Sequence, residues 1–501
     1  MQNIELTGQK LRPEQVTLLA QGGTQAHIAT AALERATEAA DAAERIAARQ
    51  PVYGRTTGVG ANRTQHVEEG DLTHGMRLLR SHAGGIGRVV PRTATRAMLA
   101  VRANQLLAGG AGLRPEIIEA IVGALNADEL PEIHEYGGIG TADLTALAEL
   151  GLALVGERPW IAADQASADA AADERPGSGG GPAPVRITSG DALALISSSA
   201  LTIGRACLAW DEARRWIRAA HGVAVLSFFA LEGSPEPYSR TVHESRPHEA
   251  QQRSAALLRA LLAGQGLKAA RIQDPYALRS IPQVHGAAMH ALDSVAQVLS
   301  VELNAAAENP LVSARDEAVY HHGGFHQAML TQSLDALNLA LLAVGHLSLA
   351  RVNMMFHPEF TGLRPFLADG EPASSGVMIL ENAAHDALSE MRNAAMPAGL
   401  GHATLSRGVE DHSPFTSQSR RQTARSVDAL QLVLGTELVS AMRTLRLRGQ
   451  TPTPGTTLAD LYTLAEVLDP GTADRATTPD VHHAARLLPS IADAVEEAER
   501  A

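Results

Sequence analysis

Apolar residues recur at three- and four-residue spacing along most of the chain, which is the pattern of helices that bury one face. Before residue 190 the pattern predicts shorter helices over 25–50, 71–83, 91–107, 114–124 and 143–156. After it, the predicted helices are longer: 190–220, 247–265, 283–307, 326–355, 379–395 and 416–448. Long helices with little surface charge usually pack against several neighbours. We therefore expect a mainly α protein built on a long helix bundle, with a small α+β region at its N-terminus.

The breaks in the pattern suggest three regions. Residues 1–190 form an N-terminal region that carries loops, residues 191–450 form the central bundle, and residues 451–501 form a C-terminal helical region. Residues 161–186 are rich in Ala, Asp, Gly and Pro and cannot bury much apolar surface, so a mobile surface loop is expected there. The stretch PVYGRTTGVGANR (51–63) is predicted to be a structured loop.

Composition narrows the class of protein. Aromatic residues are only 3% of 501 residues, and the net charge is −13 with dispersed Lys and Arg, which argues against a nucleic-acid partner. The single cysteine, Cys207, excludes an internal disulfide framework and fits a reducing cytoplasm. The start MQNIELTGQKLRPEQ lacks the layout of a signal peptide, and no apolar run is expected to span a membrane. A cytoplasmic protein without a membrane partner is predicted.

Four stretches carry chemistry, and each also has an ordinary structural interpretation. Tyr53 lies in the glycine-rich loop and could be a packing residue; His82 follows in RSHAGGIG. Tyr276 and Arg279 lie in QDPYALRSIPQVHGA, where the arginine could simply pair with a carboxylate. Glu410 in GVEDHSPF could be a helix N-terminal charge.

The remaining stretch, ELNAAAENP, runs on into HHGGFHQA. The neighbouring pairs His321-His322 and His482-His483 do not share a helical face and lack carboxylates or cysteines at ligand spacing. No metal site is expected.

Taken together, these stretches resemble the histidine and aromatic amino-acid ammonia-lyases over nearly the whole chain. YGRTTGVG corresponds to their Tyr-Gly-x-x-Thr-Gly-x-Gly, SHAGGIG to Ser-His-Ala-x-Gly-x-Gly, and QDPYALRSIPQV to Gln-Asp-x-Tyr-Ser-Leu-Arg-x-x-Pro-Gln-Val. ELNAAAENP and GGFH match Glu-Leu-Asn, Asp/Glu-Asn-Pro and Gly-Asn-Phe-His. The resemblance implies the ammonia-lyase (fumarase/aspartase-like) bundle. It also implies a homotetramer whose active sites each draw on three chains.

The resemblance also implies roles for individual residues. Tyr53 would be the base and Arg279 would hold the carboxylate of an amino-acid-like substrate. Tyr276 and Phe325 would line the pocket, while His82 and Glu410 would face the substrate side chain. Further binding positions implied by the family elements are Asn304 and Ser197.

The family's prosthetic group is 4-methylideneimidazole-5-one (MIO), made from an Ala-Ser-Gly triad that precedes Asp-Leu. Here Asp143-Leu144 matches that dipeptide, but only Thr141-Ala142 stands between it and Gly140. The stretch is one residue short and has no Ser-Gly. Cyclisation at Thr141 is also disfavoured, because the methyl of Ala142 hinders the attacking amide. Gly140, Thr141, Ala142 and Asp143 are therefore interpreted as the position of a lost triad.

A second Ser-Gly occurs in Thr188-Ser189-Gly190, within ITSGDALAL. Its continuation matches a different family element, Lys-Glu-Gly-Leu-Ala-Leu-Ile-Asn-Gly-Thr, which opens a helix. We therefore expect Ser189 to be an N-cap and Ser197 to replace the asparagine that contacts the cofactor. Other departures fall at positions that would touch the cofactor: Gly324, Val409 and Glu149.

Three hypotheses follow. The first is a lyase-like enzyme that needs no MIO and uses Tyr53 as base in an elimination, addition or cyclisation. The second is a conventional ammonia-lyase or aminomutase whose MIO forms from Thr188, Ser189 and Gly190. The third is a non-catalytic homologue that binds a small molecule or a partner.

Overall fold

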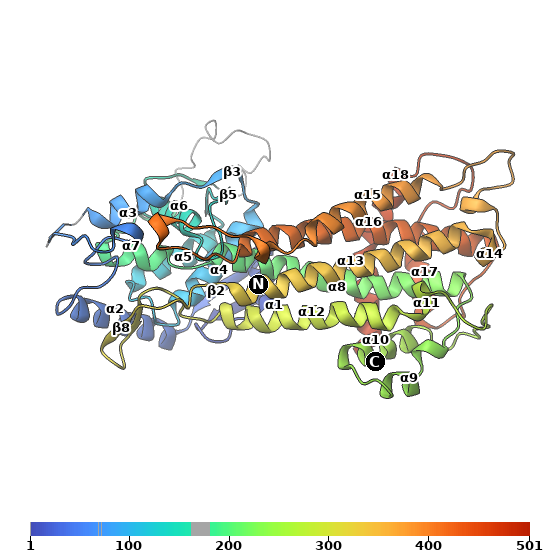
Figure 1. Cartoon of the computed structure of the whole chain (residues 1–501), viewed down its shortest axis with the longest axis horizontal. Helices are drawn as coiled ribbons and strands as arrows, with labels where there is room; N and C mark the ends of the chain where they lie inside the picture. Colours follow the sequence, from blue (N-terminus) through green and yellow to red (C-terminus); the bar gives the residue numbers. More distant parts are fainter. Residues whose placement is uncertain (1, 69, 72, 162–180, 501) are drawn as a thin grey trace. The chain divides into compact units, whose positions relative to one another are not determined.

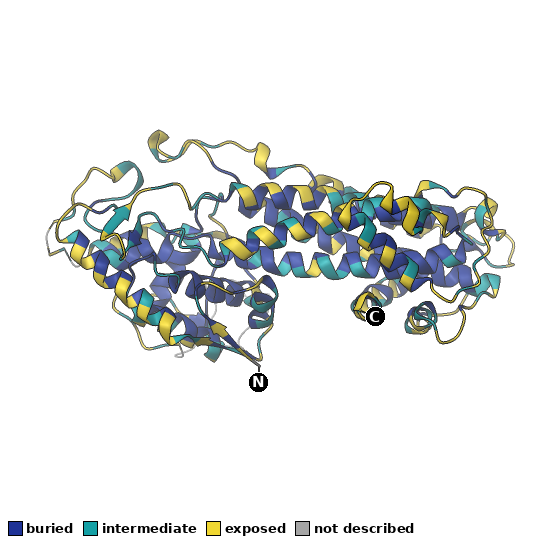
Figure 2. Cartoon of the chain, turned by 90° about the horizontal axis from the view of Figure 1, so that it is seen from below, coloured by how far each residue is buried: buried dark blue, intermediate teal, exposed yellow. Residues whose placement is uncertain are grey.

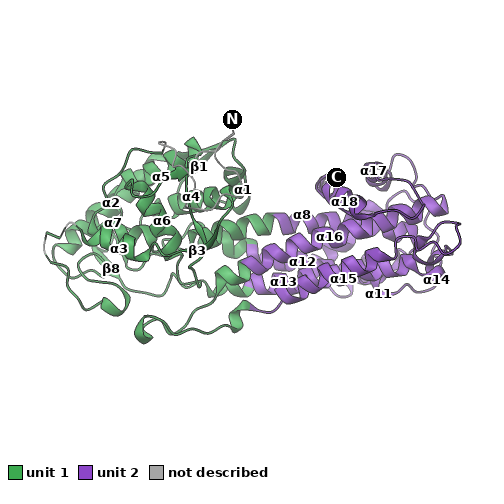
Figure 3. Ribbon diagram, turned by 90° about the horizontal axis from the view of Figure 1, so that it is seen from above, with its two compact units in different colours: residues 1–211, 296–332, 398–420 green, residues 212–295, 333–397, 421–501 purple. Residues whose placement is uncertain are grey.

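The computed structural model describes residues 2–68, 70–71, 73–161 and 181–500. Most of the loop predicted over 161–186 therefore lies outside the described residues. The chain divides into two compact units, each discontinuous in sequence (Figure 3). Unit 1 comprises residues 1–211, 296–332 and 398–420, and unit 2 comprises residues 212–295, 333–397 and 421–501. The three-region division predicted from the sequence remains a prediction.

Unit 1 combines short helices with four two-stranded sheets among its described residues. Its helices are α1 (Pro13–Gln21), α2 (Thr30–Ala47), α3 (His74–His82), α4 (Arg92–Leu106), α5 (Pro115–Ala127), α6 (Leu144–Leu154) and α7 (Ser189–Ile196). The strands pair as β1 (Gln2–Leu6) with β2 (Thr24–Ile28), β3 (Ile86–Val89) with β5 (His134–Tyr136), β4 (Leu130–Pro131) with β6 (Trp160–Ile161), and β7 (Leu311–Ser313) with β8 (Ala318–Tyr320). The β1–β2 pair is parallel, and the others are antiparallel. The small α+β region predicted from the sequence is confirmed.

Four long helices contribute residues to both units: α8 (Ala200–Ala230), α12 (Ile281–Glu302), α13 (Ala328–Phe356) and α16 (Thr416–Arg448) (Figure 1). Unit 2 adds α9 (Arg240–Glu244), α10 (Glu249–Leu261), α11 (Tyr276–Arg279), α14 (Pro358–Thr361), α15 (Ile379–Ala394), α17 (Thr457–Ala465) and α18 (Thr478–Arg500). Short 3₁₀ turns lie at Gly60–Asn62, Glu236–Tyr238, Pro365–Leu367, Ala398–Leu400 and Ser406–Gly408. The predicted mainly α bundle is confirmed.

The amphipathic pattern explains how helices are placed in unit 2. In α15, the buried residues Leu380, Ala384, Leu388, Met391 and Ala394 follow one another at three- or four-residue steps. Their spacing puts them on a single buried face, while the residues between them stay partly or fully exposed. Figure 2 shows the same division of buried and exposed residues along the long helices.

A buried ion pair ties three of the long helices together in unit 2. Arg351 of α13 donates to both carboxylate oxygens of Glu437 of α16, at 2.6 and 2.9 Å. Ser227 of α8 and Ser348 of α13 donate to the same carboxylate. Because every carboxylate oxygen is bonded, this charge is compensated inside the bundle.

Two predictions need correction. The helix expected over 190–220 is two helices, since α7 ends at Ile196 and α8 begins at Ala200, with the buried residues Ser197, Ser198 and Ser199 between them. The helix expected over 25–50 begins only at Thr30, because residues 24–28 form β2.

Two helical stretches are long and apolar enough, by length and composition alone, to cross a membrane: Ser189–Ala230 and Ala328–Phe356. This differs from the sequence expectation that no run would qualify. Their apolar windows are 89% and 56% buried within the chain, and core helices of soluble proteins pass the same test.

Candidate active site

The glycine-rich loop holds Tyr53 in a tight series of turns. The backbone N–H groups of Arg55 and Thr56 both donate to the carbonyl of Val52, at 3.1 and 2.9 Å. The chain then returns so that the N–H of Gly60, which has φ of +54°, donates to the phenol oxygen of Tyr53 at 2.7 Å. The loop thus fixes the position of the tyrosine oxygen through its own backbone.

The surroundings of Tyr53 favour the neutral phenol. Burial raises the pKa of Tyr53, and the charge of Glu410 raises it further. The hydrogen bond from Gly60 and the charge of Arg63 act in the opposite direction. In the isolated chain, Tyr53 is therefore a weaker acid than a free phenol.

A second loop brings Glu410 to the glycine-rich loop. Leu405 and Glu410 form an isolated antiparallel bridge, with their backbones joined at 2.7 and 3.3 Å. The hydroxyl of Ser406 accepts a hydrogen bond from the N–H of Ala61 at 3.1 Å. A Cβ atom at Gly60 would lie 2.6 Å from that hydroxyl and 3.7 Å from a Glu410 carboxylate oxygen. Glycine at position 60 therefore allows the two loops to meet.

The backbone at the position predicted for the lost triad is fixed by hydrogen bonds to three of its own carbonyl groups. The N–H of Phe415 donates to the carbonyl of Ile139 at 2.8 Å, and that of Gln327 donates to Gly140 at 3.1 Å. The hydroxyl of Ser417 donates to the carbonyl of Gly138. Gly140 has φ of +94°, and a Cβ there would lie 2.6 Å from the Thr416 hydroxyl. The loop is thus clasped by the start of α16 and by the segment before α13.

Asp143 follows this loop and is buried. Its carboxylate accepts from the N–H and hydroxyl of Thr202 at 2.7 and 2.8 Å, and its own N–H donates to Ser198 at 2.7 Å. Burial raises the pKa of Asp143, whereas the bonds from Thr202 lower it. The residue joins the start of α6 to the first turn of α8.

Thr188-Ser189-Gly190 opens α7, as predicted, but the N-cap is Thr188 rather than Ser189. Asp191 accepts from the N–H and hydroxyl of Thr188 at 2.9 and 2.7 Å, which forms a capping box. The side chain of Ser189 instead donates to the carbonyl of Asp71 at 3.2 Å. The cap shifts by one residue because only Thr188 stands three positions before an acidic side chain.

Ser197 lies beside Tyr53 in a small cavity of about 20 Å³, which also borders Glu308 and Asn309. The hydroxyl of Ser197 accepts from the N–H of Asn309 at 3.0 Å. Glu308 pairs with the fully buried Arg102 at 2.8 Å, and this ion pair fixes the segment that follows ELNAAA. This volume suits roughly one water molecule, so a substrate needs more space than this cavity provides.

The next segment also reaches Tyr53. The ring of His321 lies edge-on to the ring of Tyr53, with centroids 6.3 Å apart. His322 bonds through Nε2 to the carbonyl of Glu308 at 2.7 Å and accepts from the N–H of Gly324 at 2.8 Å. Phe325 follows and is half-buried.

Two predicted binding residues have protein partners. The amide of Asn304 exchanges hydrogen bonds with the backbone of Leu11, both at 2.9 Å, and also contacts Asn104 and Ser300. These contacts do not favour a role toward substrate, which remains a prediction. His82 ends α3, and its Nδ1 lies 2.8 Å from the carbonyl of Leu78. That contact favours a proton on Nδ1 and leaves Nε2 as an acceptor.

Tyr276 and Arg279 belong to unit 2, where α11 is firmly held. The hydroxyl of Tyr238 donates to the carbonyl of Leu278 at 2.6 Å, and Arg351 donates to Ala277 at 3.2 Å. The Arg279 guanidinium lies 4.5 Å from the centre of the Tyr276 ring. Among the described residues, no carboxylate pairs with Arg279, and its buried Nε lacks a hydrogen-bond partner. Arg279 therefore keeps donors for a carboxylate ligand.

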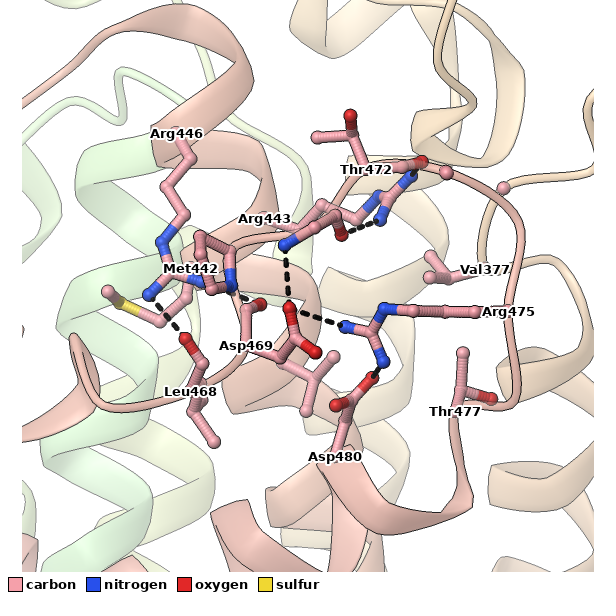
Figure 4. A pocket seen from close by; sticks show the side chains of 15 residues that line it. Val377, Met442, Arg443, Arg446, Leu468, Asp469, Thr472, Arg475, Thr477 and Asp480 are labelled. Carbon is pink, nitrogen blue, oxygen red and sulfur yellow. Dashed lines mark hydrogen bonds and ion pairs between the residues drawn. The ribbon is translucent and has the colours of Figure 1, made fainter. Parts of the chain in front are cut away.

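Unit 2 also contains a small cavity between α16 and the start of α18, and the arginines that line it already have protein partners (Figure 4). Arg443 donates to the carbonyls of Leu367, Gly471 and Thr472. Arg475 pairs with Asp480 at 2.8 Å. The cavity measures about 20 Å³, so it serves the packing of the helix ends.

Unit 1 thus brings together Tyr53, Glu410 and Ser197, with Phe325 on an adjoining segment. Tyr276 and Arg279 lie in the other unit, and the roles predicted for all of these residues remain predictions. The sequence motifs predicted no role at this site for Ser406, His321, His326 or His412. His326 and His412 were visible only as members of the motifs GGFH and VEDH.

Comparisons with known proteins point to one family over nearly the whole chain. The profile of the family described as aromatic amino acid lyase matches residues 11–466. The histidine ammonia-lyase of Symbiobacterium thermophilum is 31% identical over 502 residues, covering 97% of each chain.

Solved structures give the same result. Histidine ammonia-lyase from Trypanosoma cruzi matches with a TM-score of 0.88 at 28% identity, covering 99% of this chain and 95% of that one. Ergothionase from Treponema denticola shares the fold, with a TM-score of 0.89 at 24% identity and coverage of 98% and 99%. The chain belongs to the aromatic amino acid lyase family.

Proposed function

We propose that this chain is a lyase-like enzyme that acts on a carboxylate-bearing, amino-acid-derived substrate without a backbone-derived MIO group. The observation that carries the proposal is the sequence Gly140-Thr141-Ala142 at the place where the family has its triad. These residues do not fit the group: no serine is present to be dehydrated, and the third position is alanine. The buried methyl of Ala142 opposes the close approach of its amide that ring closure requires.

The geometry of Thr188-Ser189-Gly190 also supports the proposal. Ring closure there would need the amide of Gly190 to attack the carbonyl carbon of Thr188. That carbonyl is the first acceptor of α7 and takes bonds from the N–H groups of Asp191 and Ala192, at 3.2 and 3.3 Å. Cyclisation would break this first turn and its capping box.

The reaction is then limited by what the side chains can do. A base removes a proton from carbon, its bonding electrons form the new double bond, and the leaving group departs with the electrons of its own bond. Without an added electrophile, the substrate needs a better leaving group, an already acidic proton or an intramolecular addition. Tyr53 is the proposed base, and Arg279 holds the carboxylate as a bidentate pair.

The pocket around the substrate is proposed to include Tyr276, Phe325, His82 and Ser197, with Glu410 facing the substrate side chain. A carboxylate in a pocket needs a cation or donor, so Glu410 favours a basic or hydrogen-bonding side chain. A cationic nitrogen on the substrate would also offset the raised pKa of Tyr53 by favouring the phenolate.

We also propose that the enzyme works as a cytoplasmic homotetramer with shared active sites. Tyr53 and Arg279 lie in different units of the chain, so they need not act within one subunit. Large apolar side chains are exposed on the helices of unit 2 and at the ends of α15, which supports burial against other copies: Leu339, Met378, Ile379, Met396 and Leu432.

The test is a substrate screen with the purified full-length enzyme. The panel contains L-amino acids, their Nα-trimethyl forms and their N-carbamoyl forms, and the new double bond is followed by ultraviolet absorbance. We expect turnover of at least one derivative, abolished in Tyr53→Phe and absent for the matching decarboxylated compound. Absence of turnover across the panel, or turnover that survives Tyr53→Phe, would contradict the proposal.

A further inference from the structure

His326 and His412 form a hydrogen-bonded imidazole pair in unit 1. The Nε2 atom of His326 lies 3.0 Å from Nδ1 of His412, and the ring centroids are 5.1 Å apart with planes tilted by 34°. Two imidazole nitrogens at this distance share one hydrogen, so one ring is the donor and the other the acceptor.

The pair joins the segments that surround the proposed site. His326 precedes Gln327, which donates to the carbonyl of Gly140, and Phe325 lies on its other side. His412 stands two residues after Glu410 and three before Phe415, which donates to Ile139. The pair therefore sits on both segments that clasp the position of the lost triad.

The direction of the hydrogen bond follows from the charge state of the pair. When His412 is an imidazolium, both of its ring nitrogens carry hydrogen, so its Nδ1–H donates and Nε2 of His326 accepts. Burial and the nearby His412 lower the pKa of His326, which disfavours the charged form of this ring. His412 is exposed, and its Nε2 has no protein partner within the part of the chain that the structure describes.

We propose that His412 is the general acid for the leaving group and that His326 is the positioning residue that orients it. The inference rests on the proposed function. Tyr53 takes the proton from carbon, the C–H electrons form the double bond, and the C–N bond breaks. The leaving amino group takes the Nε2 proton of the His412 imidazolium and departs as ammonia, leaving both rings neutral.

Other titratable groups lie on the same segments as the pair or next to them. His321 and His322 lie on the segment of His326, Glu410 and Asp411 lie on that of His412, and Tyr53 contacts both segments through its loop.

The kinetic test compares a free amino substrate with its Nα-trimethyl form, whose nitrogen leaves without needing a proton. We expect His412→Gln to lower kcat roughly 100-fold for the free amine and to leave the trimethyl form nearly unchanged. The alkaline fall in kcat for the free amine should also disappear. His27→Gln, an exposed histidine on β2, is the control and should match the wild type.

Variants of His326 test the positioning role. Glutamine can still accept from Nδ1–H of His412, so His326→Gln should keep most of the activity that His326→Leu loses. Equal losses for both leaving groups in His412→Gln would overturn the proposal, as would identical activities of the two His326 variants.

A titration that needs no substrate separates this inference from the proposed function. In full-length protein with ¹⁵N-labelled histidine, His326→Leu should shift the NMR titration of His412. An unshifted His412 titration would overturn the inference even if an activity is found. If the titration shifts but no panel compound turns over, the proposed function fails, and with it the acid role of His412.

Discussion

The N–H of Gly60 donates to the phenol oxygen of Tyr53 at 2.7 Å, so the proposed base is held by the backbone of its own loop. The positive φ of Gly60 and its close approach to Ser406 make both the bond and the meeting of two loops possible. A hydrogen bond to the phenol oxygen stabilises the phenolate more than the phenol. Burial and Glu410 oppose it, and the balance gives Tyr53 a raised pKa.

Activity is therefore expected to rise with pH. A base must be deprotonated to act, and the raised pKa of Tyr53 puts its midpoint above the ordinary value of 10.0 in the free enzyme. For a substrate whose leaving group needs no proton, such as an Nα-trimethyl form, a plot of kcat/KM should climb through the alkaline range. Glu410→Gln should move that climb to lower pH by removing a repulsive charge. An unmoved profile would show that Glu410 does not act on Tyr53.

Replacement of Arg279 is expected to weaken carboxylate binding. Arg279→Met removes a bidentate pair and should raise KM roughly 30- to 100-fold, which corresponds to about 2–3 kcal/mol. Arg240→Met, an exposed arginine of α9, is the matched control. An unchanged KM in Arg279→Met would remove this residue from the substrate site.

The buried histidines of unit 2 are expected to make the protein acid-sensitive. His221 bonds to Ser254 at 2.8 Å, its ring packs edge-on to His285, and burial lowers its pKa from 6.5 to about 4. Between these values the unfolded chain binds more protons than the folded chain, so stability falls as the pH falls. Thermal denaturation between pH 4 and 7 measures this.

His285→Met offers a sharper form of the same test. Neither ring nitrogen of His285 has a hydrogen-bond partner among the described residues, and the ring is fully buried. A side chain without unpaired polar atoms should stabilise the protein by about 1–3 kcal/mol. It should also reduce the loss of stability between pH 7 and pH 4. A lower melting temperature at pH 7 would mean that an ordered partner satisfies this imidazole.

Removal of one partner of the ion pair between Arg351 and Glu437 is expected to destabilise the protein. Arg351→Met leaves a fully buried carboxylate without its charge partner and should cost about 3–5 kcal/mol. The double variant with Glu437→Leu should recover part of this loss, since neither charge remains buried. Urea denaturation of both proteins measures the difference, and an additive loss would contradict the coupling.

The sequence predicted the helices well where one apolar face was continuous. The expected bounds 416–448 coincide with α16, and 379–395 exceeds α15 by one residue. The break at Ser197 was missed because small serines interrupt a buried stretch without changing its periodicity. The Thr188 cap was displaced by one residue because both Thr188 and Ser189 are good caps.

The site was only partly visible in the sequence. Motifs pointed to Tyr53 and Glu410 separately, but their proximity depends on the return of the loop at Gly60, which no periodicity encodes. His326 and His412 are 86 positions apart, so their hydrogen bond could not be inferred from spacing.

The most direct test of the central claim is the intact mass of the purified full-length protein, followed by peptide mapping of residues 135–160 and 187–196. We expect the full mass calculated from the sequence and unmodified peptides at Gly140–Asp143 and Thr188–Gly190, in a preparation that turns over a substrate. A mass lower by two waters, mapped to either segment, would contradict the account and identify a conventional MIO enzyme.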